Sequence, residues 1–191
     1  FKIGNGPSSS HTMGPRRAAE QYHERHPEAA SFKVTLYGSL AATGKGHMTD
    51  VAIIEALSPK RVEIDWQPQT VLSFHTNAMK FEAVDSFGKL SDAWTVYSIG
   101  GGALAEDGKP LSQSPSIYKM THMSEILGWC ERTGKSYWEY VAECEEPDIW
   151  DHLAEVWQVM RSAVERGLEA EGVLPGPLNL SRKASKYHIK A

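Results

Sequence analysis

The chain has 191 residues, of which 41% are hydrophobic and 23% are charged, as in an ordinary globular protein with a sizeable core. A formal net charge of −4 argues against nucleic acid or an anionic membrane surface as the partner. With only 2 cysteines and no long apolar run, neither a disulfide framework nor a membrane span is expected. A reducing, cytoplasmic setting is therefore predicted.

Residues 6–15 read GPSSSHTMGP, a polar stretch bounded by Gly-Pro steps. Pro15 suits the first turn of a helix, which predicts a helix over residues 16–25. Hydroxyl groups beside the N–H groups of a helix start are typical of anion binding, and His11 adds a group that titrates near neutrality. A capped helix start after a plain turn explains the same residues equally well.

Alternating apolar and polar residues over 32–37 predict a half-buried strand, and the glycine-rich segment TGKGHMTD follows at 43–50. It is not a phosphate-binding P-loop, because Gly38 is one residue too far from Gly44 and because Gly46 stands where Ser or Thr is required. One imidazole and one carboxylate are also a thin ligand set for a metal. Positioned acid–base or hydrogen-bonding groups are the favoured interpretation.

Strands are predicted at residues 61–65, 79–84 and 93–100, with a hairpin turn at 86–88. The last strand runs into three glycines in the string SIGGG, which indicates either close approach to a ligand or a tight bend. The first part of the chain is therefore expected to be α+β, with a mixed or antiparallel sheet flanked by helices.

From residue 121 onward the pattern is helical, with helices predicted at 123–134, 136–140 and 148–171. This divides the chain into an α+β core (1–105), a linker-like segment (106–120) and a helical extension (121–191). Cys130 and Cys144 are interpreted as packing residues, and no metal ligands are expected in this chain.

The strings GPSSSHTMGPRRAA, YGSLAATGKGHMTDVAI and YSIGGG, in this order and spacing, resemble the beta domain of bacterial iron–sulfur L-serine dehydratases. The tail EGVLPGPLNLSRKAS resembles the start of the alpha, catalytic half in single-chain members. The resemblance implies a lyase that converts L-serine to pyruvate and ammonia and that assembles as a homodimer. It also implies a 4Fe-4S cluster bound by an alpha domain that is not in this chain.

The resemblance also implies roles for particular side chains. His47 and Thr49 are expected to handle the proton taken from the substrate. The residues expected to bind the carboxylate and amino group of L-serine are Ser8, Ser9, Ser10, His11 and Thr12, with Lys45, Ser98 and Gly100 in second rank.

Two other classes of function stay open. One is a non-catalytic regulatory module that binds serine or a related anion, which needs anion donors but no positioned base. The other is a dimerisation scaffold, for which the hairpin edge and the aromatic-rich helices are the supporting features.

Cluster binding needs several thiolates at suitable spacing, which Cys130 and Cys144 do not supply. The isolated chain is therefore expected to bind no cluster and to have no dehydratase activity. Anaerobic incubation with iron and sulfide checks this, and a stoichiometric visible absorption band would contradict it.

Overall fold

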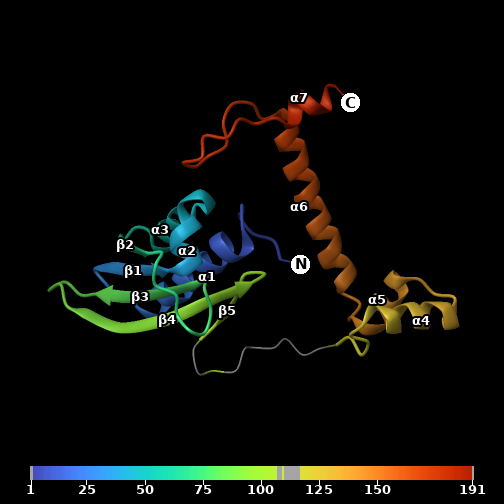
Figure 1. Cartoon of the computed structure of the whole chain (residues 1–191), viewed down its shortest axis with the longest axis horizontal. Coiled ribbons are helices and arrows are strands. Elements are labelled where there is room, and N and C mark those ends of the chain that lie inside the picture. Colours follow the sequence, from blue (N-terminus) through green and yellow to red (C-terminus); the bar gives the residue numbers. More distant parts are fainter. Residues whose placement is uncertain (1, 107–108, 110–116, 191) are drawn as a thin grey trace. The chain divides into compact units, whose positions relative to one another are not determined.

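The computed structural model describes residues 2–106, 109 and 117–190. The chain divides into two compact units, one within residues 1–111 and 168–191 and the other within residues 112–167 (Figure 1). Most of the linker-like segment predicted at 106–120 lies outside the described residues. The division into three segments, 1–105, 106–120 and 121–191, stays a prediction.

The first unit is an α+β fold built on a five-stranded sheet in the order β2-β1-β3-β4-β5. β1 is parallel to β2 and antiparallel to β3, which makes the sheet mixed and confirms the predicted fold class. Its elements in chain order are η1 (Ser9–Met13), α1 (Gly14–Arg25), β1 (Ser31–Tyr37), α2 (Gly38–Thr43), η2 (Gly44–His47), α3 (Thr49–Leu57), β2 (Arg61–Gln67), β3 (Ala78–Val84), β4 (Leu90–Gly100), β5 (Ala103–Ala105) and α7 (Ala184–His188).

The core lies between one face of this sheet and the helices α1 and α3. Phe32, Val34 and Leu36 alternate along β1 and are fully or almost fully buried, as a strand with one covered face requires. Tyr22 of α1 is also buried, and its hydroxyl accepts the Ala83 N–H of β3 at 2.9 Å. α1 is thus fixed to the sheet by apolar packing and by one buried hydrogen bond.

Two stretches expected to be irregular are helical. Residues 38–47 form α2 and η2, although the sequence pattern indicated a strand end followed by a loop. Gly38 ends the strand at φ +49, and a Cβ there would lie 2.6 Å from the Thr76 carbonyl oxygen, so only glycine fits. Likewise, residues 9–13 form a single π-helical turn that runs directly into α1.

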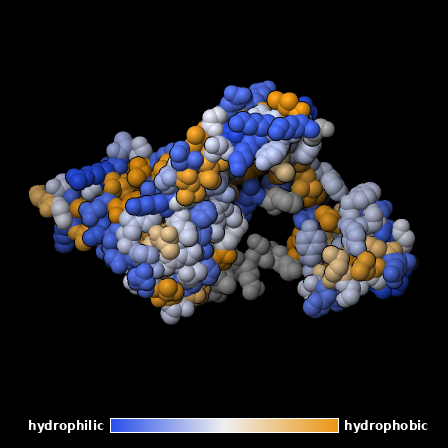
Figure 2. All heavy atoms as spheres, turned by 45° about the horizontal axis from the view of Figure 1, so that its top comes forward, coloured by the Kyte–Doolittle hydropathy of each residue, from blue (hydrophilic) through white to orange (hydrophobic). Residues whose placement is uncertain are grey.

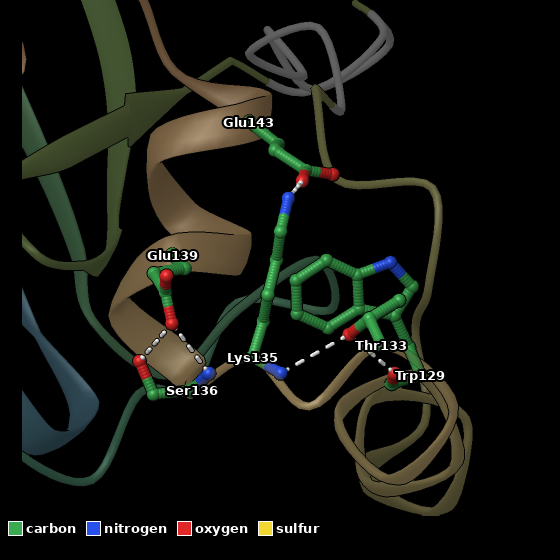
Figure 3. A network of polar contacts seen from close by, with 6 residues as sticks. All are labelled: Trp129, Thr133, Lys135, Ser136, Glu139 and Glu143. Carbon is green, nitrogen blue, oxygen red and sulfur yellow. Dashed lines mark hydrogen bonds and ion pairs between the residues drawn. The ribbon is translucent and has the colours of Figure 1, made fainter.

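The remaining helices are α4 (Met123–Thr133), α5 (Tyr137–Cys144) and α6 (Ile149–Glu169). Gly134 ends α4 at φ +70, and the Glu139 carboxylate accepts hydrogen bonds from the Ser136 N–H and hydroxyl at the start of α5 (Figure 3). Lys135 pairs with Glu143 across this turn. Gly134 is thus the C-cap of α4, and Ser136 with Glu139 forms the capping box of α5.

These helices leave many apolar side chains in contact with solvent. Tyr140 is buried, but Trp138, Trp157 and Val164 are each about 60% exposed. Figure 2 shows strongly hydrophobic residues, in orange, among the hydrophilic ones on the surface. Within the described ranges, no helix is long and apolar enough to cross a membrane.

Candidate functional site

The polar stretch at residues 8–12 and the segment at residues 44–49, which contains η2, are joined by two reciprocal hydrogen bonds. Thr12 Oγ1 donates to the His47 carbonyl at 2.8 Å, and Thr49 Oγ1 donates to the His11 carbonyl at 2.5 Å. Both threonines are buried. Thr12 therefore holds the backbone of His47, and Thr49 holds the backbone of His11. The two imidazole rings are thereby brought close together.

The imidazole rings of His11 and His47 lie with their centroids 4.7 Å apart and their planes at 37°. His11 Nδ1 is 2.9 Å from Ser10 Oγ, and His11 Nε2 is 3.1 Å from Ser39 Oγ. Both ring nitrogens of His11 are thus engaged by hydroxyl groups, which fixes the orientation of the ring.

Partial burial lowers the pKa of His11 below its ordinary value of 6.5, and the adjacent His47 lowers it further because two imidazolium ions repel one another. The hydrogen bond with Ser39 acts in the opposite direction but is the smaller effect. This environment therefore favours the neutral form of His11.

His47 is oriented by a backbone carbonyl of its own segment. Its Nδ1 lies 3.0 Å from the Thr43 carbonyl oxygen, which is an acceptor only, so Nδ1 carries the hydrogen. In the neutral ring Nε2 then keeps its lone pair, and this atom has no hydrogen-bond partner in the part of the chain that the structure describes. The hydrogen bond at Nδ1 thus sets the tautomer of His47, and it leaves Nε2 as the nitrogen that can act as a base.

The third motif, SIGGG, supports the start of α1. Gly102 lies beside Met13, and its carbonyl accepts from Arg17 Nη1 at 3.4 Å. Ser98 is fully buried against Gly14, and its hydroxyl has no hydrogen-bond partner among the described residues. The motif thus lies next to the site as a packing element.

The predicted site residues fall into three groups. Those that the structure brings together are Ser8, Ser10, His11, Thr12, His47 and Thr49, with the Ser8 hydroxyl accepting the His11 N–H at 3.1 Å. Ser9 and Lys45 are exposed, and Lys45 Nζ lies 5.5 Å from the centre of the Trp66 ring. Ser98 is buried beneath Gly14, and a Cβ built on Gly100 meets no atom within 4 Å.

Ser39 and Thr43 were not singled out from the sequence, although both lie within the string YGSLAATGKGHMTDVAI. They sit one α-helical turn apart, and the Thr43 hydroxyl donates to the Ser39 carbonyl at 2.9 Å. The signal that could have found them is a helical reading of residues 38–43, which places Ser39 and Thr43 on one face. The loop interpretation concealed this spacing.

No group of three or more His, Cys, Asp or Glu side chains is placed to hold a metal ion among residues 2–106, 109 and 117–190. Cys130 and Cys144 are both free thiols in the helical segment. The described residues therefore do not fit an iron–sulfur cluster, whose ligation requires several thiolates.

The close packing of Gly14 on Ser98 gives a direct test of how the third motif supports the site. A Cβ on Gly14 would lie 2.2 Å from Ser98 Oγ and 2.9 Å from Ser98 Cβ, so Gly14→Ala is expected to lower the free energy of unfolding by roughly 1–3 kcal/mol. Adding Ser98→Gly removes the clashing atoms and should restore most of the loss. Urea unfolding followed by NMR signals of β1 measures both.

Gly167→Ala is the control for this pair, because a Cβ at Gly167 meets no atom within 4 Å. It is expected to leave the first unit unchanged. If Gly14→Ala were harmless, or if Ser98→Gly failed to relieve it, the packing described between these residues would be wrong.

The facing histidines generate a second prediction. Replacing His47 by Asn removes the neighbouring group that becomes positive, so the pKa of His11 is expected to rise toward 6.5. Because the folded protein favours neutral His11, acidification below 6.5 costs stability, and this cost grows until the pH has passed the lowered pKa. An NMR pH titration of the His11 ring measures the shift.

His23→Asn, on the far part of α1, is the matched control and should leave the His11 titration unchanged. A His11 pKa that does not respond to His47→Asn, or that responds equally to His23→Asn, would contradict the described pairing of the rings.

Comparison with known proteins agrees with the motifs that form this site. The family described as serine dehydratase beta chain matches residues 1–65 and 58–109. L-serine dehydratase 1 of Escherichia coli is 33% identical, over 97% of this chain and 52% of that protein. L-serine dehydratase of Streptomyces coelicolor is 34% identical over 97% of this chain and 52% of its own length, so the chain spans about half the length of these relatives. The chain belongs to the serine dehydratase beta chain family.

Proposed function

We propose that this chain forms the substrate-facing part of an L-serine dehydratase, with the reacting L-serine bound between the serine stretch and His47. The observation that carries the proposal is the free Nε2 of His47, whose tautomer is fixed by the Thr43 carbonyl. The names of the relatives, each an L-serine dehydratase, indicate the substrate.

The reaction removes water from L-serine and then releases ammonia. In the proposal, His47 Nε2 takes the α-proton, and the Cα–H electron pair forms the Cα–Cβ double bond. The β-hydroxyl receives a proton from the His47 imidazolium and leaves as water, which returns His47 to its neutral form. The resulting aminoacrylate tautomerises to an imine, which water hydrolyses to pyruvate and ammonia. A positioned base of this kind contributes about 10²–10⁴-fold to the rate.

The neighbours of His47 suit it to this role. When His47 becomes an imidazolium, Nδ1–H still donates to the Thr43 carbonyl, which stabilises the positive charge. His11 stays neutral because burial and His47 both lower its pKa, so the two rings do not repel one another. Thr49 is fully buried and already donates to the His11 carbonyl, so the proposal assigns it to positioning rather than to proton transfer.

The hydroxyls of the opening stretch are proposed to receive the charged ends of L-serine. Ser10 is half-buried and lies between Ser8 and the His11 ring, so its hydroxyl can turn toward a carboxylate. Ser9 is exposed on the same turn. Thr12, in contrast, is engaged with the His47 carbonyl, and it acts by holding the two motifs together.

The proposal assigns the 4Fe-4S cluster to the half of the enzyme that the relatives possess beyond this chain. As the family resemblance implies, such a cluster would supply Lewis-acid assistance to the departure of the substrate hydroxyl. The free thiols Cys130 and Cys144 do not fit cluster ligation. The homodimer and the cytoplasmic setting stay predictions.

His47→Ala in the complete enzyme is expected to lower kcat by about 10²–10⁴-fold, because it removes the base while leaving the serine-binding hydroxyls in place. Steady-state kinetics measure kcat and KM, and the visible absorption of the cluster shows that the variant is intact. His23→Ala provides a control on a helix residue outside the site.

If the site belongs to a regulatory module, the same His47→Ala experiment gives a different result. If His47→Ala left turnover unchanged and shifted only the saturation by serine, the site would be a sensor and the proposed base would be wrong.

A further inference from the structure

The tail segment of residues 172–182 forms an ordered hairpin beyond the α+β core. Val173 and Ser181 make an antiparallel bridge, flanked by hydrogen bonds of 2.8 Å from Leu174 N–H to the Leu180 carbonyl and from Arg182 N–H to the Gly172 carbonyl. Gly176 at φ +113 and Asn179 at φ +50 turn the chain between its two arms. We call this segment the tail hairpin.

The tail hairpin contacts the segment that carries His47, on both sides of that residue. A Cβ built on Gly46 would lie 3.6 Å from Leu178 Cδ1, which is ordinary van der Waals contact. A Cβ built on Gly176 would lie 3.6 Å from Met48 Cγ and 3.8 Å from Met48 Sδ. The tail hairpin therefore lies beside the glycine that precedes His47 and beside the methionine that follows it.

Met48, the residue after His47, has a left-handed backbone at φ 55 and ψ 35, so its neighbours bear on the geometry of this turn. A residue with a side chain is held in this region only where its surroundings fix it. The Met48 N–H bonds to the carbonyls of η2, its carbonyl accepts from the Ala52 N–H, and its side chain lies beside Gly176, within reach of a Cβ placed there. The hairpin is thus one of the restraints on the turn that directs His47.

We propose that the tail hairpin is a positioning element of the site: Leu178 and Gly176 hold the turn at Gly46–Met48 and thereby fix the orientation of His47. The consequence for catalysis rests on the proposed role of His47 as the base. The positioning itself is a statement about the folded chain and is tested without turnover.

The test compares Leu178→Ala with Leu180→Ala in the same 191-residue chain. Leu180 is also a half-exposed leucine of the hairpin, at 52% against 61% for Leu178, and its backbone takes part in the ladder. Amide hydrogen exchange at Met48 and the ring resonances of His47 are measured by NMR. Leu178→Ala is expected to speed exchange at Met48 by at least about fivefold and to shift the His47 ring, whereas Leu180→Ala leaves both unchanged.

Gly176→Ala tests the other contact. It strains a backbone at φ +113 and adds an atom 3.6 Å from Met48 Cγ, so it should also alter exchange at Met48. Unchanged exchange and unchanged His47 resonances in both Leu178→Ala and Gly176→Ala would overturn the proposal, as would an equal effect of Leu180→Ala.

In the complete enzyme, Leu178→Ala is expected to lower kcat several-fold with little change in KM, since it displaces the base without removing any group that binds serine. If His47→Ala retained full turnover while Leu178→Ala still altered the Met48 amide, the proposed base would fail and the positioning by the hairpin would stand.

Discussion

Two threonine hydroxyls, each donating to the backbone carbonyl of the other motif's histidine, are the interactions on which the site depends. Thr12 and Thr49 lie on η1 and α3, elements that are separated in the chain by α1, β1, α2 and η2. Both threonines are buried and their bonds to the carbonyls of His47 and His11 are part-buried, so a shift of one element alone would break a hydrogen bond that water does not readily replace. These two hydrogen bonds set the distance between the two imidazole rings.

The two histidines that these bonds bring together differ in the hydrogen bonds made by their ring nitrogens. His11 is held through both ring nitrogens by hydroxyl groups, and burial disfavours its charged form. His47 is held through Nδ1 alone, which leaves Nε2 as the nitrogen able to accept a proton. One histidine with both ring nitrogens engaged, beside another with a single nitrogen left to accept a proton, is an arrangement suited to acid–base chemistry.

The α+β fold could be predicted because its signals are local. The alternation of apolar and polar residues indicates β1 without reference to the rest of the chain. In the same way, Gly134 marks the end of α4, and the capping box at Ser136 marks the start of α5. The helix at residues 38–43 was missed because it depends on the burial of Leu40, which no local pattern reveals. Tertiary packing there overrides the weak propensity of a glycine-rich segment.

The candidate site was predictable in part, and for a similar reason. The polarity of the opening stretch and of the GKGH loop identified His11 and His47, but the pattern could not show that Thr12 and Thr49 bind backbone carbonyls. Ser98 was chosen for its hydroxyl beside glycines, yet that hydroxyl is covered by Gly14. The identity of a polar residue does not tell whether its side chain faces substrate or the protein interior.

A crystal structure of the complete enzyme with L-serine bound tests the central claim most directly. The account predicts that the α-carbon of serine lies within about 3.5 Å of His47 Nε2, with Nδ1 bonded to the Thr43 carbonyl and the carboxylate near Ser9 and Ser10. L-serine bound away from both histidines, with His47 Nε2 facing solvent, would contradict it.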